Sequence, residues 1–250
     1  LLTLLAGLMA AGAFTALAIS FSYRYGKLAV APGYDDVMYF LDGLRRLDLA
    51  RAGGPWVLAR DIFADPPHSP FSTYAAVLSF AAFGRADWAP YAANGLIVLG
   101  MLVLVAHLTQ GMSLWGRGFC YTLALCSNLA FHSIYDFRPD LACGLMCAAA
   151  CLLALEEHWP SASLGRRLLV GALFGLALLT KPTISVLTLA LLLALPIAQL
   201  LQAHFAASPP CDVKSLIRAW LPAWALLVLL ALPFYLVAWP HLVNYFQRSV

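Results

Sequence analysis

The sequence predicts an all-α polytopic membrane protein, and composition is the first observation behind this class. Of 250 residues, 62% are hydrophobic and only 11% are charged, whereas charged residues make up about 25% of typical soluble domains. The mean hydropathy is +0.82. A soluble core could not bury so many apolar side chains, so most of them must face lipid. The net charge of +3 is too small to indicate a nucleic-acid partner.

Long apolar runs are the second observation. A hydrocarbon core of ~30 Å requires roughly 17–25 apolar residues in a helix. The sequence therefore predicts about seven transmembrane helices within one domain over 1–250. The runs cover 1–20, 89–108, 118–135, 139–156, 164–180, 183–203 and 219–238. Because the chain begins at Leu1 rather than Met, we expect it to be a piece of a longer protein. The first run lacks a basic leader and predicts a retained helix.

Residues 21–88 form a long polar interval, which we interpret as an external first loop bearing interfacial helices. Apolar residues at 37, 40, 41, 44 and 47 repeat at helical spacing, so 37–49 predicts an amphipathic helix lying in the membrane interface, ended by the glycines and proline of 51–55. We therefore expect replacement of Phe40 to damage folding and replacement of Arg46 to be mild. The apolar stretch 71–83 is too short to span comfortably and is placed flat or partly inserted.

The distribution of basic residues favours an inside N-terminus. Five cations then fall in the short cytoplasmic loops and three in the short external loops and tail. This orientation holds only if 71–83 does not span. It places a set of chemistry-bearing residues together on the external face, namely Asp35, Asp36, Asp65, His68, Asp136, Arg138, Asp140 and Lys181.

Three cysteines at 143, 147 and 151 follow one stripe of a helix. Three thiols could bind a soft metal, but no histidine or acid shares the stripe at ligand spacing. Small residues at a helix–helix seam explain the pattern better. We predict no disulfide framework and no zinc site.

Each external polar residue also has a structural explanation. Asp140 follows Pro139 and suits the first turn of a helix. Lys181 suits a lysine that extends to the lipid headgroups, and Asp136 with Arg138 suits an interfacial ion pair. Asp65 and His68 suit a capped turn better than a metal site. Ionisable groups at this depth are nevertheless costly unless they are paired, hydrated or bound to a charged ligand.

Taken together, these motifs resemble a known family along essentially the whole chain. The motifs are the acidic pair Asp35-Asp36 after the first helix, the turn Pro66-Pro67-His68, the helix end Ala82-Phe83-Gly84, the stretch from Tyr135 to Asp140, Gly175 followed by Lys181, and the aromatic stretch from Pro233 to Phe246. This combination is similar to the GT-C class of integral-membrane glycosyltransferases, in particular the protein O-mannosyltransferase superfamily that includes the aminoarabinose transferases of lipid A. Many members have Asp-Glu where this chain has Asp-Asp, and members are typically longer.

The resemblance implies transfer of a sugar from a polyprenyl-phosphate donor to a hydroxyl on a glycolipid, cell-envelope glycan or protein. A carboxylate acting as base gives inversion by single displacement. By resemblance Asp35 is this base, and Asp36 or Asp140 orients the acceptor or a metal. Lys181 and Arg138 pair with the donor phosphate.

The resemblance further implies a multi-pass protein of the bacterial inner membrane with its site on the periplasmic face, in contact with membrane lipids. A divalent cation held by Asp65 and His68 is an open alternative, and no organic cofactor is expected. A secondary transporter or flippase remains the alternative function, and an assembly subunit without activity is a third. Transporters place charges at mid-bilayer and often contain repeats, whereas these charges gather at one face.

Overall fold

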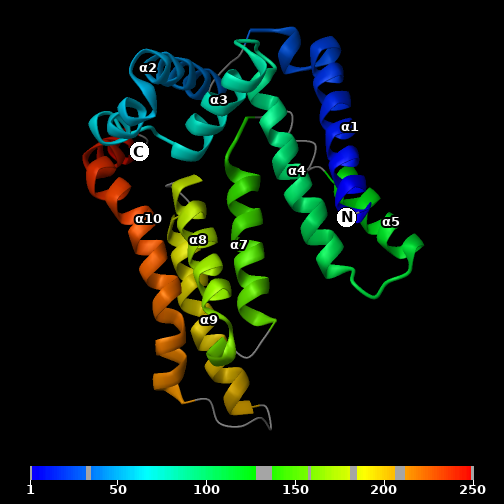
Figure 1. The fold of residues 1–250 in the computed structure, drawn as a ribbon, viewed down its shortest axis with the longest axis vertical. Helices are drawn as coiled ribbons and strands as arrows, with labels where there is room; N and C mark the ends of the chain where they lie inside the picture. Colours follow the sequence, from blue (N-terminus) through cyan, green and yellow to red (C-terminus); the bar gives the residue numbers. More distant parts are fainter. Residues whose placement is uncertain are drawn as a thin grey trace. The chain divides into compact units, whose positions relative to one another are not determined.

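The computed structural model describes residues 2–31, 35–127, 137–156, 159–180, 185–205 and 212–248, and within them the chain is helical with no strand. It forms two compact units (Figure 1). The first unit comprises Leu1–Arg60 and Phe71–Leu141, and the second comprises Asp61–Pro70 and Ala142–Val250.

Figure 1 shows the helices in their order along the chain. The chain begins with α1 (Leu2–Tyr25), the single-turn η1 (Lys27–Ala29), α2 (Asp35–Ala64), α3 (Pro70–Phe83), α4 (Ala89–Leu108) and α5 (Leu114–Cys126). It continues with α7 (Asp140–Leu155), the single-turn η2 (Trp159–Ser161), α8 (Leu164–Thr180), α9 (Ser185–Phe205) and α10 (Val213–Arg248).

The chain is a membrane protein by the length and apolar character of its helices. Among the described residues, four helical segments are long and apolar enough to cross a bilayer: Leu5–Tyr25, Ala89–Leu108, Ser185–Gln202 and Val213–Pro240. The helices α5, α7 and α8 have 13, 16 and 17 residues, or roughly 20–26 Å at 1.5 Å per residue. The count of seven spans therefore stays a prediction. The second half of the predicted run 118–135 lies outside the described residues.

Helix α2 contains the predicted amphipathic helix 37–49 and continues beyond it. At Gly54 the backbone leaves helical geometry, with φ 78° and ψ 179°, and Pro55 begins a second helical segment. The predicted break at 51–55 is therefore present, whereas the segment after it was not predicted. Glycine suits this position because other residues rarely adopt a positive φ.

The buried face of α2 differs from the predicted one. Phe40 is buried, as its expected importance for folding requires, but Leu41 is 62% exposed. Arg46 is buried, which disagrees with the expectation that its replacement would be mild. Apolar character alone did not identify the whole face, because the ionisable residues Asp36 and Arg46 are also buried in it. The buried positions are Asp36, Tyr39, Phe40, Gly43, Arg46 and Leu47.

The cysteine stripe lies in the core of the second unit. The Sγ of Cys143 lies 3.5 Å from the carbonyl oxygen of Ala177 in α8, and the Sγ of Cys147 lies 3.7 Å from Oγ1 of Thr188 in α9. Cys151 packs against the same core cluster. The interpretation of this stripe as a helix–helix seam is confirmed.

Two polar side chains, those of Arg166 and Gln199, cap the C-terminal end of α7 by hydrogen bonding to its last carbonyl groups. The Nε of Arg166 donates to the carbonyl of Leu153 at 2.8 Å, and its Nη2 contacts the Glu156 carboxylate at 2.6 Å. The Nε2 of Gln199 donates to the carbonyl of Ala154 at 2.7 Å. These donors satisfy carbonyls that a helix end otherwise leaves without partners.

Helices α8 and α10 approach so closely at Gly171 that no side chain fits between them. A Cβ added there would lie 2.3 Å from the carbonyl oxygen of Ala223, whereas one added at Gly165 in the same helix would meet nothing within 4 Å. Gly171→Ala should therefore destabilise the protein by about 1–3 kcal/mol, the usual cost of overpacking. Gly165→Ala serves as the matched control and should be neutral or slightly stabilising. Thermal unfolding in detergent measures both, and equal melting temperatures would contradict the close approach.

Candidate functional site

Asp36 is a buried carboxylate in the first turn of α2. Its side chain is 3% exposed. The Oδ2 atom accepts a hydrogen bond from the hydroxyl of Tyr91 at 2.8 Å and from Nζ of Lys27 at 3.4 Å. A buried charge is costly unless it is paired and hydrogen-bonded, and these two donors offset that cost. Asp36 therefore joins the start of α2 to η1 and to α4.

Asp35 is the first residue of α2, and the structure describes its backbone only. Acidic groups in a first helical turn interact favourably with the helix dipole. Hydrogen bonds from Tyr91 and Lys27 hold Asp36 in place, and they thereby also position the backbone of the preceding residue, Asp35. The two adjacent acids are thus distinguished by environment: Asp36 takes part in packing, and Asp35 stands at the helix start.

An aromatic cluster brings the segment before α7 against the start of α2. The Phe40 ring lies 5.5 Å from that of Phe137 and 5.6 Å from that of Tyr91, between ring centroids, and Tyr39 also contacts Phe137. Phe137 is almost fully buried. The ring of Phe80 in α3 completes the cluster. Phe137 therefore anchors the residues that follow it close to the acidic end of α2.

Arg138 and Asp140 directly follow this anchor. Both are exposed, and Asp140 is the first residue of α7. A charged ligand can reach exposed groups, and here they lie on the segment that Phe137 holds against α2. The first unit thus packs Phe137 on the early turns of α2, and Arg138 and Asp140 follow Phe137 within three residues of the chain.

Lys181 and Asp136 lie outside the described residues. Asp65 and His68 are exposed and belong to the second unit. Within the part of the chain that the structure describes, no group of three or more histidine, cysteine or acidic residues is arranged to hold a metal ion. The metal role of Asp65 and His68 stays a prediction.

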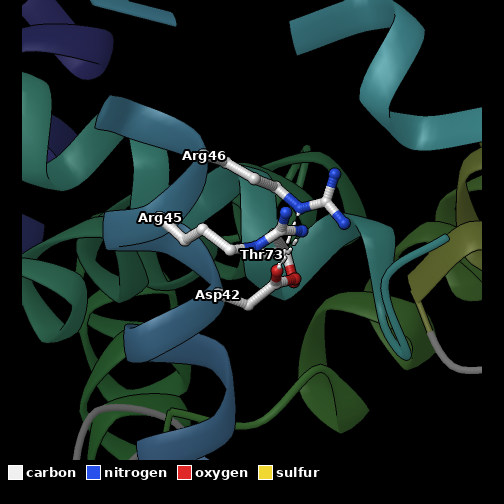
Figure 2. A network of polar contacts seen from close by, with 4 residues as sticks. All are labelled: Asp42, Arg45, Arg46 and Thr73. Atoms are coloured by element: carbon white, nitrogen blue, oxygen red, sulfur yellow. Dashed lines mark hydrogen bonds and ion pairs between the residues drawn. The ribbon is translucent and has the colours of Figure 1, made fainter. Parts of the chain in front are cut away.

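A second polar network, which the sequence did not predict, fixes the middle of α2 (Figure 2). The Oδ1 of Asp42 accepts hydrogen bonds from Nη2 of Arg45 at 3.2 Å and from Nε of Arg46 at 3.1 Å. Its Oδ2 accepts from the hydroxyl of Thr73 in α3 at 2.9 Å. Figure 2 shows the carboxylate facing all three groups. The i, i+4 spacing of Asp42 and Arg46 was the available signal for this pair.

Comparison with known proteins adds nothing to the geometry: no family model, curated protein sequence or solved structure matches the chain.

The contacts of Asp36 predict a loss of stability when they are removed. Asp36→Asn keeps the shape of the side chain but removes its charge from the two donors, and should cost about 1–3 kcal/mol. Tyr91→Phe keeps the ring packing and should cost about 1 kcal/mol, the worth of one hydrogen bond. The exposed Asp87 provides the control, since Asp87→Asn should stay within about 0.5 kcal/mol. Unfolding in detergent measures all three, and equal stability of the Asp36 and Asp87 variants would refute the structural role.

The two arginines on Asp42 allow a matched comparison. Their side chains are 1% exposed for Arg46 and 42% exposed for Arg45, while that of Asp42 is 24% exposed. Arg46→Gln should cost about 3 kcal/mol, the lower end for breaking a buried pair. Arg45→Gln should cost less than about 1 kcal/mol, as for exposed pairs. Melting temperatures of the two variants in the same detergent test this, and an Arg46 variant as stable as the Arg45 variant would contradict the burial.

Proposed function

We propose that the chain is part of a membrane glycosyltransferase that moves a sugar from a polyprenyl phosphate to a hydroxyl acceptor at the external face of the membrane. The observation that carries the proposal is the meeting of two segments in the first unit. Phe137 packs on Tyr39 and Phe40, in the helix that begins with Asp35, and Arg138 and Asp140 follow Phe137 within three residues. A base and a phosphate-binding cation are the two groups that this reaction needs at one place.

The proposed reaction assigns each group one role. The Asp35 carboxylate takes the proton of the acceptor hydroxyl, and the acceptor oxygen forms a bond to the anomeric carbon. The bond from that carbon to the phosphate oxygen breaks with its electron pair, so polyprenyl phosphate leaves. The leaving group is a stable anion and needs no general acid, but its charge grows as the bond breaks. Arg138 and Lys181 would stabilise this charge.

Asp36 receives a different role from its neighbour. Its hydrogen bonds with Lys27 and Tyr91 make it a positioning residue that holds the first turn of α2. Asp140 would orient the acceptor hydroxyl. The fuller architecture, with seven spans, an inverting outcome and a bacterial periplasmic site, belongs to the same proposal. The resemblance of the motifs supports it.

Asp35→Asn should lower sugar transfer by roughly 10²–10⁴, the usual worth of general base catalysis. Donor binding should persist, because the phosphate-binding groups are unchanged. Lys181→Ala should instead weaken donor affinity by about 1.5–3 kcal/mol, the range for hydrogen bonds to charged groups. The measurement is transfer of labelled sugar from a panel of hexosyl and pentosyl polyprenyl phosphates in detergent, with donor affinity determined in parallel.

Asp87→Asn is the matched control and should leave transfer unchanged. Loss of transfer in Asp36→Asn at unchanged melting temperature, with Asp35→Asn active, would assign the base to Asp36. Full activity of both variants would refute the proposal. Movement of the sugar lipid across a reconstituted bilayer without transfer would favour the transporter alternative.

A further inference from the structure

Two arginines on α2 have no acidic partner among the described residues, and they lie on either side of an exposed tryptophan. Arg51 and Arg60 are exposed, and Trp56 is 80% exposed. Neither arginine takes part in an ion pair or hydrogen bond within the described part of the chain. We refer to residues 51–60 as the Trp56 segment.

The nearby acids of the first unit are already matched. Asp42 is bound to Arg45 and Arg46, and Asp48 is paired with Arg85. The Trp56 segment itself contains no acidic residue. Asp61, which directly follows Arg60, has an interaction of its own with another group. The pairs of Asp42 and Asp48 therefore leave the positive charges of Arg51 and Arg60 available to an anionic ligand.

A break in the backbone divides the Trp56 segment: Arg51 lies in the first helical part of α2, and Trp56 and Arg60 lie on the short arm after the break. The positive φ of Gly54 interrupts the helix, and Pro55 begins the second segment. Leu58 packs against the core cluster of the first unit, which holds the arm in place. Trp56 and Val57 stay exposed beside it. An anchored arm with an outward tryptophan and flanking arginines matches the composition of helices that lie in a membrane interface.

We propose that the Trp56 segment is a docking surface for anionic phospholipid headgroups. Guanidinium groups bind phosphate oxygens through paired hydrogen bonds. A tryptophan ring favours the headgroup level because one edge is polar and the rest is apolar. We choose a lipid as the ligand of this surface because four helical segments of the same chain are long and apolar enough to cross a bilayer. This surface is independent of the proposed transfer reaction, so the two proposals can fail separately.

The test compares the whole chain in nanodiscs of phosphatidylcholine with nanodiscs that also contain phosphatidylglycerol. Hydrogen exchange of the backbone amides in the Trp56 segment, followed by mass spectrometry, is the readout. Exchange should be roughly 25-fold slower with phosphatidylglycerol, about fivefold for each arginine, and high salt should remove the difference because it screens exposed charges. Arg51→Gln and Arg60→Gln should each reduce the difference by roughly fivefold, from about 1 kcal/mol per basic residue at an anionic surface.

Arg85 provides the matched control, since it is an exposed arginine of the same unit that already has an acidic partner. Arg85→Gln should leave the effect of phosphatidylglycerol on the Trp56 segment unchanged. Trp56→Ser should speed exchange in both kinds of disc, because the interfacial anchor is lost. Equal exchange of the unmodified protein in both discs would overturn the proposal. Slowing that depends on the number of protein copies per disc, and not on phosphatidylglycerol, would overturn it in favour of a second copy as the occupant.

Discussion

The first unit depends on the pairing of charges that its own helix α2 buries. Asp36 and Arg46 lie on the buried face of this helix, where an apolar stripe is the ordinary solution. Tyr91 of α4 and Lys27 of η1 bind Asp36. Arg46 is paired with Asp42 of the same helix, and Thr73 of α3 binds the other oxygen of Asp42. Apolar surfaces pack with little directional preference, whereas a buried charge tolerates few alternative positions. The pairs therefore fix where α2 lies along its neighbours.

This arrangement explains why α2 is a suitable support for a reactive group. Aromatic packing around Phe40 holds the helix laterally, and the bond from Tyr91 holds its first turn. A side chain at the helix start is then carried by a backbone that is fixed from two directions. Catalytic groups require such support, because small displacements are costly for rate. The same packing holds Phe137 and places the residues after it beside the helix.

The sequence predicted helices well where apolar length decides the structure. The bounds of α4 and α8 agree with the predicted runs because a continuous apolar stretch ends at polar residues or helix breakers. It predicted the buried face of α2 poorly, since a charged residue such as Arg46 is assigned to the surface unless its partner is known. Tyr91 could not be predicted as a partner of Asp36, because 55 residues separate them. The helix after Gly54 was missed because Gly-Gly-Pro ordinarily ends a helix.

The capped end of α7 has a consequence for the membranes that can accommodate this chain. A helix of 16 residues is about 24 Å long, shorter than a typical hydrocarbon core of ~30 Å. Carbonyl groups without partners cost several kcal/mol in hydrocarbon, but Arg166 and Gln199 satisfy those of Leu153 and Ala154 within the protein. The helix end therefore does not need to reach water. The end of α7 therefore keeps its hydrogen bonds within the protein in bilayers of different thickness.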